Sequence, residues 1–226
     1  KMSYILNIDT SLERASVKNS ENAGIIVAAK NDIQKQHASF LHIAIKEIAA
    51  QASFDLQHIN AIAVTNGPGS YTGLRVGMAS AKGLCYALNK PLITIGNLEA
   101  LAFAAISEKG KDIPGNALFC PMIDARRMEV FTAIYNKELQ EILPACAMVL
   151  QAEYFKTFNE KHHILFNGSG ALKWSKIAAL ENSTFLFDTD ITEAISNLSY
   201  KKFKQADFTD LKYSEPLYVK EFFIAS

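Results

Sequence analysis

The segment 66–73, NGPGSYTG, constrains the fold of this 226-residue chain more than any other. It follows directly on residues 59–65, a run rich in β-branched residues and alanine that predicts a strand buried in the middle of a sheet. Residues 74–88 then predict a helix that contains Gly77 and Gly83. Because a glycine inside a helix costs about 1 kcal/mol relative to alanine, these glycines indicate that another backbone comes close to the helix.

The rest of the first half predicts short strands and helices. Leu41, Ile45 and Ile48 recur at helical spacing, and Phe40 and Ile43 give the same helix a second apolar side. Such a helix is either buried on two sides or covered by a partner. The order of elements predicts one half of an actin-like (ribonuclease H-like) fold, with strands at 4–8, 16–18, 24–29, 59–65 and 91–95 and helices at 38–51, 74–88 and 97–106.

A stretch rich in glycine, proline and charge at 108–116 is the predicted linker between two lobes. We expect 1–107 to form the N-terminal lobe of an α/β, actin-like two-lobed fold and 108–226 to form a smaller α/β lobe. The return of the C-terminal segment to the first lobe is left open. A strand followed by a glycine-rich turn occurs at 64–69 and again at 166–170, a similarity too weak to establish a repeat.

Two turns are candidates for binding an anion such as a nucleotide phosphate. In the turn at 9–11, hydroxyl and backbone N–H groups can donate to phosphate and the acid can hold a hydrated metal, although the same residue types form ordinary turns. The glycine turn precedes a helix N-terminus, which favours anions, but it would equally serve a tight strand-to-helix connection. Its spacing is not that of a Walker loop. The candidate residues are Asp9, Thr10, Ser11, Gly67, Gly69, Ser70, Thr72 and Gly73.

A predicted hairpin tip at 124–129 carries Arg126 and Arg127. These arginines could pair with phosphate or with a partner's carboxylates, while a solvated turn with local Arg–Glu pairing explains the same pattern. The spacing of the histidines predicts no zinc site, and Gly-x-Ser-x-Gly is absent from the sequence. We therefore predict no metal site and no serine nucleophile.

Charge and cysteine content narrow the class of protein further. Lys plus Arg and Asp plus Glu each number 23, whereas a protein that binds nucleic acid alone usually has a basic excess. No apolar run approaches the length of a membrane span, and no signal peptide is evident. The composition therefore predicts a cytoplasmic protein with buried free thiols at Cys85, Cys120 and Cys146.

From the N-terminus to about residue 135, the order and spacing of several motifs resemble the TsaB (YeaZ) family. Tyr71 and Met128 stand where that family commonly has Phe and Gly, and Met128 leaves the tightness of its hairpin turn open. The motifs are IDTS at 8–11, AIAV at 61–64, GPGSYTGLRVG at 67–77, AKGL at 81–84, LEALA at 98–102 and IDARRMEV at 123–130.

The resemblance implies a two-lobed actin-like fold and a non-catalytic subunit that works with TsaD and TsaE. Together such proteins install N6-threonylcarbamoyl on adenosine in tRNA from threonylcarbamoyl-adenylate. The resemblance also implies a homodimer when the chain is alone and contact with tRNA only through the complex. It implies no required cofactor, and leaves ATP or ADP open at the interface of the complex.

The resemblance further separates this chain from the catalytic relative TsaD, which carries a metal-binding Asn-His-x-Glu-Gly-His stretch. Here residues 96–101 are GNLEAL, and the two histidine positions hold Asn97 and Leu101. Leucine cannot ligate a metal, and a lone amide oxygen is a poor substitute for imidazole. We therefore expect this chain to have no catalytic residue.

In the same family, two helices from each subunit are thought to meet as a helical bundle. Small residues let helices approach closely, so we expect the interface on the helices at 38–51 and 74–88. Burial against the chain's own sheet is the alternative for either face. The expected interface residues are Phe40, Ile43, Gly77, Ser80, Ala81 and Leu84.

Two other functions compete with a partner subunit. An ATP-binding or ATP-hydrolysing enzyme is the main alternative, because the actin-like fold often binds ATP. It would need an acid beside the phosphates, for which Asp9 and Asp124 are the candidates. A glycoprotein-cleaving protease, an old label attached to relatives, lacks any ligand set and ranks last.

Overall fold

The computed structural model describes residues 2–32, 37–51 and 55–219. The chain forms two compact units. Of the described residues, unit 1 comprises those up to Asn97 and Thr192–Leu217, and unit 2 comprises Leu98–Ile191 and those from Tyr218 onward. None of the helices in the described ranges is long and apolar enough to cross a membrane.

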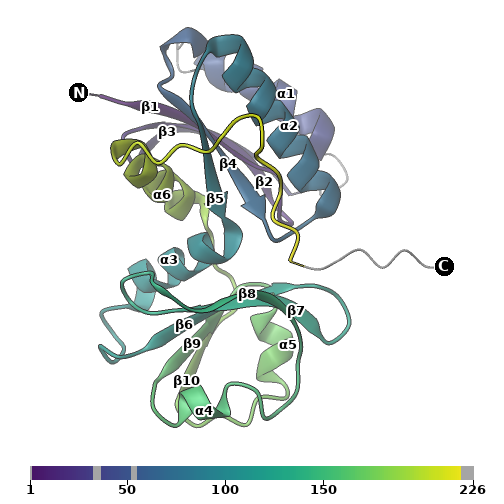
Figure 1. Ribbon diagram of the computed structural model, residues 1–226, viewed down its shortest axis with the longest axis vertical. Coiled ribbons are helices and arrows are strands. Elements are labelled where there is room, and N and C mark those ends of the chain that lie inside the picture. The colour runs from purple at the N-terminus through teal and green to yellow at the C-terminus, as the bar shows by residue number, and fades with distance from the viewer. Residues whose placement is uncertain (1, 33–36, 52–54, 220–226) are drawn as a thin grey trace, which may run out of the picture. The chain divides into compact units, whose positions relative to one another are not determined.

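The sheet of unit 1 has the strand order β3-β2-β1-β4-β5 (Figure 1). The first three strands form an antiparallel meander of β1 (Tyr4–Asp9), β2 (Ala15–Glu21) and β3 (Gly24–Asn31). On its other side β1 runs parallel to β4 (Ala61–Gly67), and β4 runs parallel to β5 (Leu92–Gly96). This order, with β2 antiparallel to the other strands, confirms the predicted ribonuclease H-like half.

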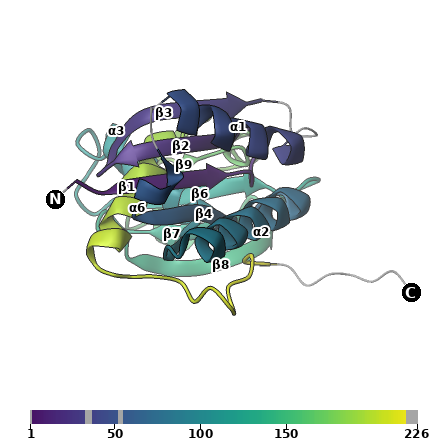
Figure 2. The ribbon, with the colours of Figure 1, turned by 90° about the horizontal axis from the view of Figure 1, so that it is seen from above.

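The helices of unit 1 pack against this sheet. Figure 2 shows α1 (His37–Gln51) beside β2 and β3, and α2 (Tyr71–Leu88) beside β4. A short 3-10 helix, η2 (Leu56–His58), leads into β4, and α6 (Thr192–Lys204) contacts β1, β3, β4 and β5. The chain therefore returns to unit 1 after completing unit 2.

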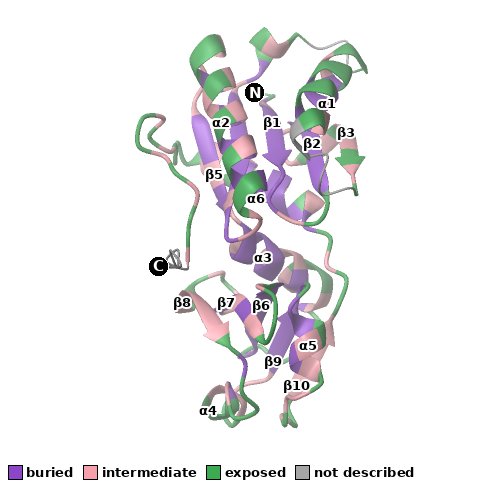
Figure 3. Cartoon of the chain, turned by 90° about the vertical axis from the view of Figure 1, so that its right-hand side faces the viewer, coloured by how far each residue is buried: buried purple, intermediate pink, exposed green. Residues whose placement is uncertain are grey.

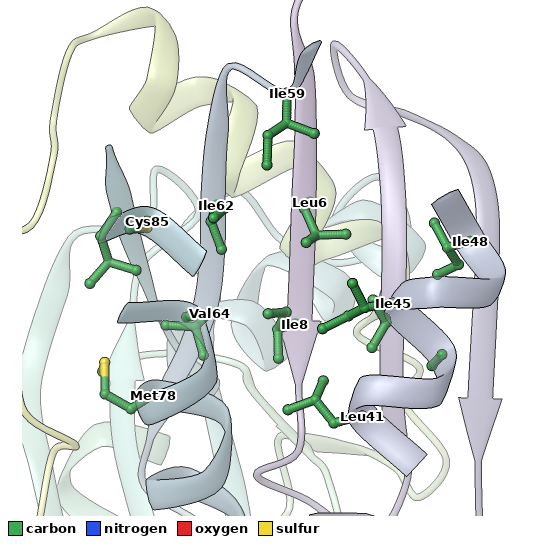
Figure 4. Close-up of a cluster of buried hydrophobic side chains, with 14 residues drawn as sticks. Leu6, Ile8, Leu41, Ile45, Ile48, Ile59, Ile62, Val64, Met78 and Cys85 are labelled. Atoms are coloured by element: carbon green, nitrogen blue, oxygen red, sulfur yellow. The ribbon is translucent and has the colours of Figure 1, made fainter. Parts of the chain in front are cut away.

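One apolar cluster joins α1 and α2 to the sheet of unit 1 (Figure 4). Each large side chain that is fully buried in it stabilises the fold by about 1.5–3 kcal/mol. Alternate residues of β1 and β4 face the two helices, as the period of a strand requires. The labelled members of the cluster are Leu6, Ile8, Leu41, Ile45, Ile48, Ile59, Ile62, Val64, Met78 and Cys85.

Unit 2 repeats the strand arrangement of unit 1. Its sheet has the order β10-β9-β6-β7-β8, in which β6 pairs antiparallel with β7 and parallel with β9. Fully buried Trp174 packs edge-to-face against Phe155 and Phe166 in the core. The elements are α3 (Asn97–Lys109), β6 (Leu118–Asp124), β7 (Glu129–Tyr135), β8 (Glu141–Val149), α4 (Lys156–Asn159), β9 (Ile164–Asn167), α5 (Ala171–Ser175) and β10 (Ser183–Leu186).

The two strand-and-glycine motifs of the sequence occupy equivalent places in the two units. Each follows the fourth strand of its unit, β4 or β9, and each contains a glycine with positive φ, 114° at Gly67 and 91° at Gly168. Each first strand also ends in an acid, Asp9 or Asp124. The weak sequence similarity therefore marks an internal structural repeat.

The unit boundary differs from the predicted one at 107. From Leu98 onward, α3 belongs to unit 2, because Asn167 Nδ2 donates to the Leu101 carbonyl at 2.9 Å and the Leu101 side chain lies against Gly168. The predicted linker at 108–116 is thus the connection from α3 to β6 within unit 2. The helix α6 lies in unit 1, where Ser199 Oγ donates to Asn7 Oδ1 at 2.7 Å.

Candidate functional site

The carboxylate of Asp9, at the end of β1, accepts hydrogen bonds from its own chain. Ser11 donates to Asp9 Oδ1 from its backbone N at 3.0 Å and from its Oγ at 2.6 Å. Thr65 Oγ1 on β4 donates to the same oxygen at 2.8 Å. All three side chains are buried. This oxygen is therefore used to hold the turn after β1 against β4.

The glycine turn packs directly on the end of β1. The Ser70 N–H donates to the Ser11 carbonyl at 2.7 Å, and Thr10 Oγ1 donates to the Gly73 carbonyl, also at 2.7 Å. A Cβ on Gly69 would overlap the Ser11 carbonyl oxygen, and a Cβ on Gly73 would overlap that of Thr10. These glycines therefore let two backbones touch, which is the packing role that the sequence left open.

The remaining candidate anion-binding residues surround the start of α2. Ser70 caps the helix, because its Oγ accepts from the Gly73 N–H at 3.3 Å. Thr72 is exposed, and Gly67 is enclosed by Leu74 and the Leu217 carbonyl. The structure thus brings the two predicted turns together, but gives the hydroxyls of Thr10 and Ser11 internal partners. Anion or nucleotide binding here stays a prediction.

Asn97 ties the two turns together from the end of β5. Its Nδ2 donates to Ser11 Oγ and to the Pro68 carbonyl, each at 2.8 Å. The side chain is fully buried, and its Oδ1 has no partner among the described residues. Sequence comparison with TsaD pointed to this position only as a lost metal ligand. Its structural role as a hydrogen-bond bridge was not predicted.

Side chains that could ligate a metal do not gather into a site in the described part of the chain. No cluster of three or more His, Cys, Asp or Glu side chains there could hold a metal ion. Leu101 stands where TsaD has the second of its two histidines. Its side chain is 2% exposed and lies against Gly168 in unit 2. The residues present at these two positions therefore serve packing and hydrogen bonding.

In unit 2, the acid at the end of the first strand has a cationic partner. Lys173 Nζ on α5 lies 2.9 Å from Asp124 Oδ1 and donates to the carbonyls of Arg127 and Glu129. The hairpin tip holds Arg126 and Arg127 at φ values of 70° and 49°. Left-handed backbone costs a non-glycine residue about 1–2 kcal/mol, so Lys173 and the Asp124 carboxylate hold a strained turn.

Both arginines at this tip are exposed, and neither has an ion-pair partner among the described residues. Met128 is 41% exposed beside them, and its carbonyl accepts from the Leu150 N–H at 2.7 Å. The hairpin thus closes with methionine at the position where the family commonly has glycine.

The buried side of α2 contains two of the six predicted interface residues. Gly77 is buried with its would-be Cβ 2.5 Å from Thr10 Oγ1, and Ala81 is fully buried in the core with Met78 and Cys85. The structure thus buries both residues against the chain's own sheet, which is the alternative that the sequence left open for this face. The cause is helical phase: both residues lie on the stripe that packs on β4.

The outward side of α2 carries a different set of small residues. Ala79, Gly83 and Ala87 recur every four residues and are exposed, and Tyr86 beside them is 84% exposed. A Cβ on Gly83 would meet nothing within 4 Å among the described residues. This stripe was not among the predicted interface residues, although its spacing of four residues is a signal that the sequence carries.

The other four predicted interface residues differ in how far they are exposed. On α1, Ile43 is 58% exposed and Phe40 is half-buried. On α2, Ser80 and Leu84 are half-buried. Figure 3 shows that α1 and α2 are exposed on the sides turned away from the sheet. We call the exposed parts of these two helices the outer helix surface; it is defined by Ile43, Ala79, Gly83, Tyr86 and Ala87.

The three thiols are free, as predicted. Burial raises the pKa of Cys85 and of Cys120 from 9.0 to about 12. The pKa of half-buried Cys146 is also raised by burial. A raised pKa lowers the fraction of each thiol that is present as the nucleophilic thiolate at neutral pH.

The two matching sheets, each with an acid after its first strand and a glycine turn after its fourth, define an α/β protein of the two-lobed actin-like class. A family model described as TsaD, tRNA N6-adenosine threonylcarbamoyltransferase, matches residues 21–214. A Bacillus subtilis protein named tRNA threonylcarbamoyladenosine biosynthesis protein TsaB is 31% identical over 168 residues, 73% of this chain and 70% of that protein. The chain belongs to the TsaB (YeaZ) family.

Further relatives agree with this assignment. The Escherichia coli protein with the same TsaB name is 32% identical over 134 residues, which are 59% of this chain and 55% of that protein. The matched segment thus spans only about half of that relative. The structure of YeaZ from Pseudomonas aeruginosa, 24% identical, superposes with a TM-score of 0.78 over 96% of this chain and 100% of that one, which supports the fold.

Proposed function

We propose that this chain takes part in tRNA threonylcarbamoyladenosine biosynthesis as a non-catalytic subunit that binds TsaD through the outer helix surface. The names of the TsaB relatives support the process, since the chain belongs to their family. TsaE joins through TsaD, and tRNA is contacted only through the complex. When TsaD is absent, the same surface pairs two copies of the chain.

The observation that carries this proposal is Gly83. A glycine in the middle of a helix costs about 1 kcal/mol relative to alanine. At Gly77 a glycine is needed because Thr10 packs where a Cβ would lie. A Cβ on Gly83, in contrast, would meet no described residue within 4 Å. The packing of the described residues gives no reason for a glycine at position 83, whereas the close approach of a second protein's helix would give one.

The surroundings of Gly83 suit such an approach. Ala79 and Ala87 extend the flat stripe by one turn in each direction, Tyr86 on the same helix is 84% exposed, and Ile43 on α1 is 58% exposed. Tyr71, at the start of the helix, is 39% exposed and lies under the Arg75 guanidinium at 4.1 Å. Small central residues with aromatic and aliphatic neighbours are typical of closely packed helix interfaces.

The site geometry supports a subunit without chemistry of its own. Asp9 Oδ1 accepts three hydrogen bonds, and Asp124 Oδ1 is paired with Lys173. An ATP-hydrolysing enzyme would need such acids to face a metal-bound nucleotide. We expect calorimetry with ATP and magnesium to detect no micromolar binding by the isolated chain, and clear binding would count against this part of the proposal. ATP or ADP at the interface with TsaD stays compatible with it.

A pull-down of the chain on tagged TsaD tests the docking surface. Gly83→Leu should lower recovery by about tenfold or more, which corresponds to roughly 1.4 kcal/mol of lost binding free energy. Gly115→Leu is the matched control, because a Cβ on Gly115 also meets no described residue within 4 Å, and Gly115 lies in unit 2, outside α2.

Size-exclusion chromatography and circular dichroism of both variants complete the test. The control should keep TsaD binding, and both variants should keep the helical content and melting of a folded chain. Unchanged recovery of Gly83→Leu on TsaD would overturn the assignment of this surface. Equal loss in both variants would show that the loss is not specific to α2.

A further inference from the structure

The segment that follows α6, residues 205–217, crosses unit 1 from β5 toward the glycine turn; we call it the C-terminal strap. Figure 1 shows it in yellow, running across β5 and then alongside α2, and Figure 3 shows the same course from another side. The strap contains no helix or strand of its own, apart from one isolated bridge. Three separate anchors hold it in place.

The first anchor covers the open edge of the sheet. Thr209 forms an antiparallel bridge to Leu92 on the edge strand β5, and its N–H donates to the Leu92 carbonyl at 2.8 Å. The Thr94 N–H donates to Thr209 Oγ1 at 3.2 Å. An uncovered edge strand can pair with other chains, so this bridge protects β5.

The second anchor is a lysine of α2. Lys82 Nζ donates to the Ser214 carbonyl at 3.0 Å and to the Lys212 carbonyl at 3.4 Å. The ammonium group has no carboxylate partner in the described ranges. Close by in the chain, Leu211 packs against the apolar cluster of unit 1. The middle of the strap is thus attached to the helix that carries Gly83.

The third anchor reaches the glycine turn. The Leu217 N–H donates to the Asn66 carbonyl at 2.7 Å. The pairing of β4 with β5 is irregular between Thr65 and Gly67, which is where this carbonyl lies. Gly67, at φ 114°, also has the Leu217 carbonyl oxygen 3.0 Å from the position of a Cβ. The end of the strap therefore closes over the first peptide of the turn that launches α2.

From these contacts we propose that the C-terminal strap is a latch on the glycine turn. Lys82 holds the strap down, and the docked strap fixes the geometry of the turn and of the first turn of α2. Release of the strap frees both. This coupling rests on contacts within unit 1 and does not depend on what binds the outer helix surface.

Hydrogen exchange of single amides in the full chain tests the latch. Lys82→Met keeps the aliphatic stem and removes both charged hydrogen bonds, so exchange at Leu217 should quicken by about tenfold. The Ser70 and Leu74 amides of the turn should quicken with it, while the Ile62 amide of β4 should not. Lys82→Arg should restore slow exchange, and Lys46→Met on the exposed side of α1 should change nothing.

A second pair of variants acts on the last anchor alone. Leu217→Pro removes the N–H that donates to Asn66, and Leu217→Ala keeps it. Only the proline variant should quicken Ser70 and Leu74. A strap that loosens in Lys82→Met while the turn keeps its slow exchange would overturn the coupling. Unchanged exchange at Leu217 in that variant would overturn the role of Lys82 as the holding residue.

Discussion

Gly77 on the buried side of α2 and Gly83 on its exposed side are explained by different neighbours. Gly77 faces Thr10, whose Oγ1 would be 2.5 Å from a Cβ there, whereas a Cβ on Gly83 would meet nothing within 4 Å in the described part of the chain. The first glycine is required by the fold. None of the described neighbours requires the second, and that contrast supports a docking surface on α2.

The two glycines should therefore respond oppositely to the same substitution. Gly77→Ala should lower the free energy of unfolding by about 1–3 kcal/mol, because its methyl group displaces the buried Thr10 hydroxyl. Gly83→Ala should raise it by up to about 1 kcal/mol, because alanine favours the helix. Urea denaturation of both variants measures this. A loss of stability in Gly83→Ala would mean that the side chain does meet an internal neighbour.

Asn97 should be a stability residue rather than a remnant of a metal site. Asn97→Ala removes the donor that bridges Ser11 and Pro68, and we expect a loss of about 1–3 kcal/mol in the free energy of unfolding. Asn197→Ala on α6 is the control, since its Nδ2 donates only to Glu193 one turn earlier at an exposed site. Thermal melts of the two variants would contradict the account if they shifted equally.

Lys173 should hold the strained hairpin tip of unit 2. Lys173→Met leaves Asp124 and two carbonyls without their cationic donor, so the tip at Arg126 and Arg127 should exchange its amides about tenfold faster. Lys176→Met, exposed and close by in the chain, should leave exchange unchanged. Slow exchange at the tip of Lys173→Met would show that other contacts hold these two residues at positive φ.

Alkaline pH should destabilise the chain through its buried thiols. The unfolded chain loses a cysteine proton near pH 9, whereas the folded chain keeps that of Cys120 until the pKa of about 12. Above pH 9 the folded state therefore binds more protons than the unfolded state. The stability that the protonated Cys120 thiol contributes is fully present below pH 9 and is lost as the pH rises toward 12. Cys120→Ser should flatten the fall in unfolding free energy between pH 9 and 11, measured by urea denaturation. An equally steep fall would contradict the assignment.

Local sequence patterns were sufficient for most of unit 1. The apolar runs of β1 and β4 and the helical spacing in α1 depend on neighbours in the chain, and these elements lie where the patterns predicted them. The strands β8 and β10 were not predicted. They are the edge strands of unit 2 and are largely half-buried or exposed, and Pro144 interrupts β8, so neither shows a clear alternation.

The site was less predictable because its contacts are long-range. Whether a glycine of α2 faces inward depends on where Thr10 lies, and the sequence alone does not place Thr10 against that helix. The same holds for Asn97, whose partners Ser11 and Pro68 come from two other segments. Residue types therefore indicated that a backbone approaches α2, but not on which side each approach occurs.

The most direct test of the docking surface is calorimetric titration of TsaD with the wild-type chain and with Gly83→Ala. We predict that this variant melts at a higher temperature yet binds TsaD about tenfold more weakly, since one methyl group separates the two helices. A variant that is more stable and binds TsaD as tightly as the wild type would contradict the claim that Gly83 is kept for a partner.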